Sequence, residues 1–322
     1  MMIRLMWLMA LLIACLAPAS ASALTVTLGP SSLPLSPGGP YSTARNSPVG
    51  SVIATATSTI QITGLSGSCS LNAVFLSGSP SSGNTYTTSV TGLGVNLYYI
   101  NAGVRTQIIP GIQASLTLSP ASPGPVTIEA DLVVTGTVSS GTLNALPSVS
   151  LLFAGLGLGC SVLNLTTQTL TVTATPGTVT ALTCTVLNPS LAITLPTISA
   201  QTLAASGKTG GATGFAIELN CNGTGAGIYI TLTDANLTTN TSSLLSLAIG
   251  SSATNVKLQI LKSSGAPVSY GPDSATAGTT NQWYVGPSMS VSSVPLTVQY
   301  VATGVATAGS VNAAATFTLS YQ

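Results

Sequence analysis

Short segments of alternating apolar and polar residues recur along this chain from residue 24 to its end. Apolar side chains fall at every second position, and clusters of Gly, Pro, Ser or Asn separate the segments, a pattern typical of half-buried β-strands joined by turns. Clear examples are LTVTL at Leu24 to Leu28, SVIATAT at Ser51 to Thr57, VNLYYI at Val95 to Ile100, VTIEADLVV at Val126 to Val134 and TLTVTAT at Thr169 to Thr175. The pattern predicts an all-β protein.

Helical periodicity is nearly absent, and SAQTLAAS at Ser199 to Ser206 could form one helical turn. At 322 residues the chain exceeds the usual size of one compact domain, which favours two. We place the boundary at Pro176-Gly177, because a Pro-Gly pair is a strong turn or linker signal. The predicted architecture is therefore two successive β-sandwich domains, residues 24–175 and 176–322.

The first 23 residues have the three parts of a secretory signal peptide. Arg4 precedes an apolar run from Leu5 to Ala17, and small residues lead to a cleavage site after Ala23. The apolar run is shorter than the ~20 residues that span a bilayer, which argues against a membrane anchor. We therefore predict that residues 1–23 are cleaved and that the protein is exported.

Four cysteines remain after the predicted cleavage: Cys69, Cys160, Cys184 and Cys221. An even number in an exported protein predicts two disulfides. Three pairings are open, and the sequential one places one bridge in each half of the chain. The chain has no His and no Cys-x-x-Cys spacing, so we expect neither a zinc site nor any other cofactor.

Charge is scarce, since Asp, Glu, Lys and Arg make up 3% of the residues and the formal net charge is +1. Binding of nucleic acid requires clustered Lys and Arg, so no nucleic acid is expected as a partner. Disordered chains are typically poor in apolar residues, whereas 45% of this chain is hydrophobic. A folded, nearly neutral protein is the expectation.

Enzyme chemistry finds little support in the sequence. Without His, neither a Ser-His-Asp nor a Cys-His arrangement can form. Glu129 and Asp131 alternate on one predicted strand and resemble a glycosidase pair, but such neighbours lie ~7 Å apart, against ~5 Å in retaining hydrolases. We interpret the two carboxylates as an exposed polar face and predict no enzyme.

Residues from about 178 to 322 carry an ordered set of segments. Cys184 lies in ALTCTVLNPSLAITLPTIS, and Cys221 closes GFAIELNC; VKLQILKSSGAPVSYG, NQWYVG, VPLTVQYVATG and GSVNAAATFTLSYQ follow. Gly309 is fourteenth from the C-terminus, and Tyr321 is penultimate. In this order the segments resemble the pilin domain of type 1 and related chaperone/usher pili. That resemblance implies a disulfide between Cys184 and Cys221.

The resemblance also implies a fold and a set of partners. Pilin domains are immunoglobulin-like sandwiches that lack their last strand, so a groove opens beside the C-terminal strand. A periplasmic chaperone fills it first, and the donor strand of another pilus subunit replaces the chaperone at the outer-membrane usher, a form of strand addition. The implied interface residues are Gly309, Val311, Ala313, Ala315, Phe317, Leu319 and Tyr321. The alternative is the last strand of a closed sandwich.

About 150 residues precede the pilin-like half, an arrangement that resembles two-domain tip adhesins. Their N-terminal domain binds a receptor and leaves no free donor strand. The segment ARNSPVGSVIATA, Ala44 to Ala56, is similar to one near the start of adhesin domains. The implied function is adhesion to a host glycan or surface receptor by an extracellular pilus tip. The alternative is a structural or adaptor subunit, with Leu24 to Leu35 as its donor strand.

Candidate ligand-binding residues of the first half are Tyr98, Tyr99, Asn101 and Arg105. Sugar sites commonly combine aromatic faces with amide and guanidinium groups, and aromatic residues are few in this chain. Because Tyr98 and Tyr99 are adjacent on a predicted strand, they face opposite sides, and at most one faces outward. The alternative for each is a half-buried strand tyrosine or a solvated turn arginine.

Overall fold

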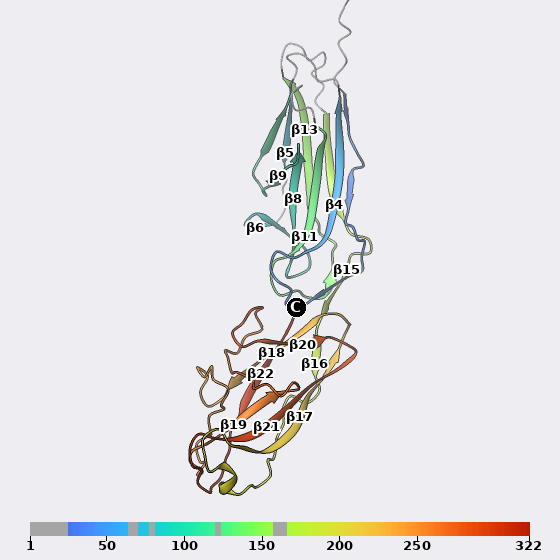
Figure 1. Cartoon of the computed structure of the whole chain (residues 1–322). Helices are drawn as coiled ribbons and strands as arrows, with labels where there is room; N and C mark the ends of the chain where they lie inside the picture. Colours follow the sequence, from blue (N-terminus) through green and yellow to red (C-terminus); the bar gives the residue numbers. More distant parts are fainter. Residues whose placement is uncertain (1–24, 64–69, 77–80, 120–123, 157–165) are drawn as a thin grey trace, which may run out of the picture.

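The computed structural model describes residues 25–63, 70–76, 81–119, 124–156 and 166–322. They form two β-sandwiches arranged end to end, with the C-terminus between them (Figure 1). The all-β prediction is confirmed, because the only helix in these ranges is the short 3₁₀ helix η1 (Ala200–Leu203). Within the same ranges, no helix has the length and hydrophobicity needed to cross a membrane. The predicted signal peptide, Cys69 and Cys160 lie outside the described residues.

The first sandwich is built from two large sheets. One has the strand order β1 (Thr25–Thr27), β4 (Val52–Thr63), β11 (Val126–Val134), β8 (Leu93–Asn101), β7 (Thr85–Thr87) and β6 (Ser81–Ser82), with β9 (Val104–Ile108) also paired to β8. The other has the order β10 (Ala114–Leu118), β5 (Ser70–Leu76), β13 (Ser148–Leu156), β14 (Thr166–Thr173) and β2 (Ser32–Pro34).

The period-two pattern explains how these sheets bury a core. In β4, Ala54, Ala56 and Ile60 are buried, whereas the alternating residues Thr57 and Thr59 are exposed. The apolar sides of both sheets meet in one cluster of buried side chains. The polar sides of the strands therefore form the outer faces of the sandwich.

A small third sheet lies at the end of the first sandwich nearest the second. It has the order β12 (Gly141–Thr142), β15 (Thr178–Leu182) and β3 (Tyr41–Ala44). Strand β15 follows Pro176-Gly177, yet Val179 and Ala181 pack in the core of the first sandwich. The side chains that follow in the sequence, starting with Leu182 and Cys184, pack against the second core.

The segment Leu24 to Leu35, which the sequence left open as a donor strand, is part of the first sandwich over its described residues. Strand β1 pairs antiparallel with β4, and β2 pairs parallel with β14. Leu33 and Leu35 are buried in the core, at 0% and 4% exposure. Their burial leaves this segment unavailable for pairing with another molecule while the sandwich stays folded.

The second sandwich packs a four-stranded sheet against a three-stranded one, an incomplete immunoglobulin-like fold as predicted. The larger sheet has the order β16 (Cys184–Val186), β17 (Thr209–Cys221), β21 (Val291–Ala302) and β19 (Val256–Lys262). The smaller sheet has the order β20 (Trp283–Pro287), β18 (Gly227–Asp234) and β22 (Ala315–Tyr321). Cys184 and Cys221 lie directly opposite each other on β16 and β17 and form the expected disulfide.

The two sandwiches touch through the loop after β3. The backbone N–H of Asn46 donates to the carbonyl of Tyr321 at 2.8 Å, and Asn46 Oδ1 accepts from the backbone N–H of Tyr321 at 3.2 Å. Ala44 is buried in the core of the second sandwich. The last strand of the chain is thereby held by a loop of the first sandwich.

Candidate functional site

The outer edge of β22 is unpaired. This strand lies at one side of its sheet and pairs with β18. On its other edge, Tyr321 bonds to Asn46, and no further backbone partner is found among the described residues. An unpaired edge presents backbone N–H and C=O groups that another strand can bind. The edge of β22 is therefore the first element of a candidate binding site.

Residues 190–198 form the opposite wall of this site. The segment is extended, and no backbone hydrogen bond joins these residues to the rest of the described chain. Its ends are fixed: the Asn188 side chain donates to Ala216 O at 3.0 Å and accepts from Glu218 N at 2.9 Å, and Ser199 caps η1. Between these anchors, the backbone donors and acceptors are free to pair with an added strand.

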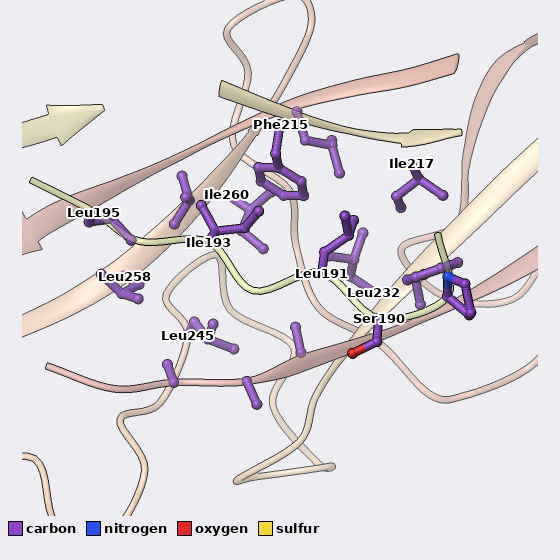
Figure 2. A pocket seen from close by; sticks show the side chains of 17 residues that line it. Ser190, Leu191, Ile193, Leu195, Phe215, Ile217, Leu232, Leu245, Leu258 and Ile260 are labelled. Atoms are coloured by element: carbon purple, nitrogen blue, oxygen red, sulfur yellow. The ribbon is translucent and has the colours of Figure 1, made fainter. Parts of the chain in front are cut away.

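An apolar hollow of about 350 Å³ lies between the two walls. Leu191, Ile193 and Leu195 come from the segment 190–198 (Figure 2). Ala313, Ala315 and Phe317 come from β22 and the residues before it. The hollow is floored by core side chains of both sheets: Ile217, Leu232, Leu258, Ile260, Leu296 and Val298. Apolar side chains that enter it would be removed from water, at about 25 cal/mol per Å² buried.

A second hollow, of about 320 Å³, continues along the same two segments. It is lined on one side by residues of 197–203 and on the other by residues 306–311. Gly309 is essential to this shape, since a Cβ there would lie 2.4 Å from the backbone nitrogen of Ala253. We call the two hollows together the strand groove.

The structure places five of the seven predicted interface residues in the strand groove. Ala313, Ala315 and Phe317 line the first hollow, and Gly309 and Val311 line the second. Leu319 packs against the core of the second sandwich without lining either hollow.

Tyr321 lies at the junction of the two sandwiches instead. It is 6% exposed, and its hydroxyl donates to Cys184 O at 2.9 Å. Burial raises the pKa of this phenol above its usual value. This hydrogen bond joins the end of β22 to β16, the first strand of the second sandwich.

Strand β22 is shorter than the segment that sequence reasoning selected. It begins at Ala315 because the residues before it pair with a different part of the chain: Ala248 N donates to Asn312 O at 2.7 Å, and Ser252 N donates to Ser310 O at 3.0 Å. The segment 190–198 was missed as a wall of the groove. Its signal was the alternation of Leu191, Ile193 and Leu195 with no partner strand assigned.

The candidate ligand residues of the first sandwich are divided between two faces. Tyr99 stacks on Phe75 with ring centroids 4.7 Å apart and packs against the core. Asn101 donates to Pro125 O at 3.4 Å. Tyr98 and Arg105 lie together on the outer face, with the guanidinium carbon 3.4 Å from the centroid of the tyrosine ring. The structure thus brings two of the four predicted residues together.

Arg105 is engaged by both carboxylates of β11. Its Nε donates to Glu129 Oε1 at 2.7 Å, and Nη2 donates to Asp131 Oδ2. Burial alone would lower the pKa of Arg105, but these two acceptors raise it above its usual value. The guanidinium is thus held in one position by its own chain. Among the residues that the structure describes, no group of three His, Cys, Asp or Glu side chains could hold a metal ion.

Comparisons with known proteins identify relatives of the second sandwich. A family model described as "Fimbrial protein" matches residues 171–322. The chain is similar to the F17c-G fimbrial adhesin of Escherichia coli, with 41% identity over 143 residues, 43% of this chain and 41% of that one. The chain therefore spans about two fifths of the length of that relative.

The chain covers a larger share of two other proteins. The major fimbrial subunit SMF-1 of Stenotrophomonas maltophilia is 34% identical over 144 residues, which are 43% of this chain and 85% of that subunit. Among solved structures, the CupB6 tip adhesin from Pseudomonas aeruginosa has 14% identity and a TM-score of 0.39, over 92% of each chain.

Proposed function

Since the chain belongs to the fimbrial protein family, we propose that it is an extracellular pilus subunit at the tip of its fibre. Its second sandwich accepts a donor strand, and its first sandwich mediates adhesion. It is a fibre protein and not an enzyme. Before assembly, a periplasmic chaperone occupies the strand groove, and exchange for the next subunit's strand takes place at the outer-membrane usher. We place the junction between the two domains at Thr183, where the packing changes from the first core to the second.

The strand groove is the observation that carries this proposal. A strand inserted there finds unpaired backbone on both sides, from β22 and from residues 190–198. Alternate side chains of that strand enter the two apolar hollows. Backbone pairing thus contributes affinity, and the hollows select the side chains, as in other cases of strand addition.

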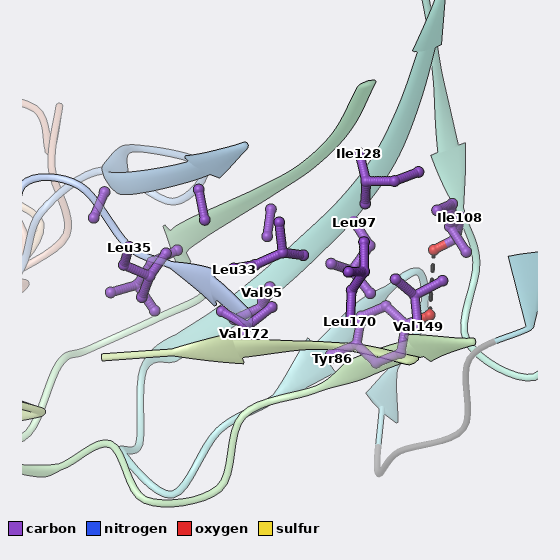
Figure 3. Close-up of a cluster of buried hydrophobic side chains, with 14 of the residues drawn as sticks. Leu33, Leu35, Tyr86, Val95, Leu97, Ile108, Ile128, Val149, Leu170 and Val172 are labelled. Atoms are coloured by element: carbon purple, nitrogen blue, oxygen red, sulfur yellow. Dashed lines mark hydrogen bonds between the residues drawn. The ribbon is translucent and has the colours of Figure 1, made fainter. Parts of the chain in front are cut away.

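The tip position is supported by the other end of the chain. Leu33 and Leu35 lie deep in the first core, beside Val172 and Val95 (Figure 3). A subunit inside a fibre must both accept and donate a strand. Here residues 25–35 belong to their own sandwich, so this segment cannot be donated without unfolding it. A subunit that accepts without donating is placed at the end of the fibre.

Filling the groove tests the acceptor role. Ala315 is half-buried and lines the first hollow, so Ala315→Trp should obstruct an incoming strand. Thr316, the next residue, is exposed on the same strand, and Thr316→Trp is the matched control. Co-purification with a co-expressed periplasmic chaperone should fall at least about tenfold for Ala315→Trp only. Equal capture of both variants would contradict a binding site in the groove.

The adhesive role rests on the likeness to a fimbrial adhesin and on a first sandwich that lies outside most of the family match. Bacteria displaying the full-length protein should bind host cells or surface-coated receptors, and bacteria with the same pilus lacking this subunit should not. Fibres that adhere equally without it would assign the chain a structural role.

A further inference from the structure

A third hollow, of about 360 Å³, opens on the outer face of the first sandwich. Strands β7, β8 and β11 and the loop 48–51 surround it, and we call it the β8 hollow. Its walls include Val49, Thr85, Gly94, Asn96 and Thr135. It lies apart from the strand groove, which belongs to the second sandwich. Its volume lies within the range of small-molecule sites.

Asn96 lines this hollow, and its side-chain amide is held in place. Its Oδ1 accepts from Thr85 Oγ1 at 2.8 Å and from Gln107 Nε2 at 3.4 Å. Gln107 is itself held by a bond from Nε2 to Asn84 O at 3.0 Å. Because both donors bind the oxygen, the Asn96 amide has one orientation, and its NH₂ group has no partner among the described residues. A ligand acceptor can take this donor without rearrangement of the side chain.

The rim of the hollow is also held in place. Gly50 N donates to Val134 O at 2.8 Å, and Val134 N donates to Ser51 O at 2.9 Å. Gly50 has a φ of 91°, a conformation that favours glycine. Val49, the residue before Gly50, is 73% exposed and offers an apolar surface at the edge of the hollow. Gly94 lacks a side chain, which allows the methyl groups of Thr85 and Thr135 to approach it closely.

The polar groups that the hollow offers are neutral. Residues 25–182 contain four charged side chains, Arg45, Arg105, Glu129 and Asp131, and none of them lines the described walls of the hollow. Asp131 lies opposite Asn96 on the neighbouring strand, but its carboxylate already accepts from Arg105 and from Thr55 Oγ1 at 2.7 Å. A charged ligand would leave its own charge without a partner here.

We propose that the β8 hollow binds a neutral saccharide unit. Sugar hydroxyls can both accept from Asn96 and donate to the threonine oxygens, and the C–H face of the ring can pack on Val49. This inference rests on the proposed adhesive function of the first sandwich. The ligand then lies beside Tyr98 and Arg105 without contacting either as its main binding surface. The guanidinium of Arg105 covers the Tyr98 ring and is already paired with Glu129.

The test uses the purified full-length chain on an array of neutral and sialylated glycans. Asn96→Ala removes the donor. Gln61→Ala is the matched control, because Gln61 is an exposed amide on β4 of the same sheet, outside the hollow. We expect the wild type and Gln61→Ala to bind a neutral glycan and Asn96→Ala to bind it at least about tenfold more weakly. Thermal unfolding of all three proteins should coincide, which excludes loss of the fold.

Two outcomes overturn the inference. One is equal binding of a neutral glycan by Asn96→Ala and the wild type, and the other is binding of sialylated glycans only. A wild type that binds no glycan overturns it as well, and adhesion to cells in the bacterial experiment then shows whether the adhesive function itself stands. Failure of the saccharide site is thus separable from failure of the proposed function.

Discussion

Single residues fix the shape of the second sandwich where two backbone segments approach too closely for a larger side chain. At Gly309, an added Cβ would lie 2.4 Å from Ala253 N and 2.7 Å from the carbonyl carbon of Ser252. Both atoms belong to the backbone, so a larger residue must displace the chain itself. The sequence located this glycine by its distance from the C-terminus, but the reason for it is a contact with residues far away in the sequence.

Gly309→Ala should therefore destabilise the second sandwich by about 1–3 kcal/mol, the usual cost of overpacking. Gly214 on β17 is the matched control, because a Cβ there meets nothing within 4 Å. We expect Gly214→Ala to change the free energy of unfolding by less than about 0.5 kcal/mol. Denaturant unfolding of both variants measures the difference, and equal stability would refute the close approach.

Asp234 gives the second sandwich a dependence on pH. Burial of this carboxylate raises its pKa, but hydrogen bonds from Ser246 N, Asn240 Nδ2 and Asn236 N more than offset burial, so the pKa is lowered from 3.8. Because the folded state binds the proton less readily than the unfolded state, the contribution to stability is full above the unfolded pKa. This contribution is lost as the pH falls below about 4 and then through the lowered pKa of Asp234 in the folded state.

Asp234→Asn should lower stability at pH 7 by about 1–3 kcal/mol, because a neutral amide satisfies these donors less well. The variant should also lose the part of the acid dependence that Asp234 supplies. Unfolding curves between pH 7 and pH 2 measure both effects. Asp273→Asn removes an exposed carboxylate from the same sandwich, and an equal response of the two variants would contradict the role of Asp234.

At the scale of elements, the sequence predicted most strands but only part of the strand groove. The alternating segments Val126 to Val134 and Val95 to Ile100 predicted β11 and the centre of β8, because side-chain alternation depends on local burial. The wall at 190–198 could not be assigned, since it has no partner strand in the part of the chain that the structure describes. The hollow beside Asn96 depends on three strands and a loop, and only the fold brings them together.

The two walls of the strand groove should be visible in amide hydrogen exchange. In the free protein, the backbone N–H groups of residues 190–198 have no acceptor among the described residues and should exchange rapidly; Pro196 carries no N–H. On strand binding they should slow at least about tenfold. Strand β21 is the internal reference, because it is paired on both sides with β17 and β19 and should be protected throughout. Rapid exchange in the presence of a bound strand would contradict the wall assignment.

For the whole molecule, the two sandwiches should respond differently to a bound strand. Calorimetry of the full chain should resolve two transitions, because each sandwich has its own core. A donor peptide at 100 times its Kd adds about 2.7 kcal/mol to the sandwich that binds it. The transition of the second sandwich should therefore rise by roughly 5–10 °C, and that of the first should not move. A single transition, or a joint shift, would contradict two independent units.

The position of the disulfide has a mechanical consequence. If the first sandwich is bound to a surface, as proposed above, tension on it reaches the second sandwich through Thr183 and Cys184. Strand β16 is 3 residues long, and its hydrogen bonds alone would yield one after another. The bond to Cys221 instead transfers the load to β17, which is 13 residues long and lies between two strands of its sheet. We therefore expect the covalent bridge to carry the force past the weakest strand, so that reduction of this bond lowers the rupture force of the protein more than its thermal stability.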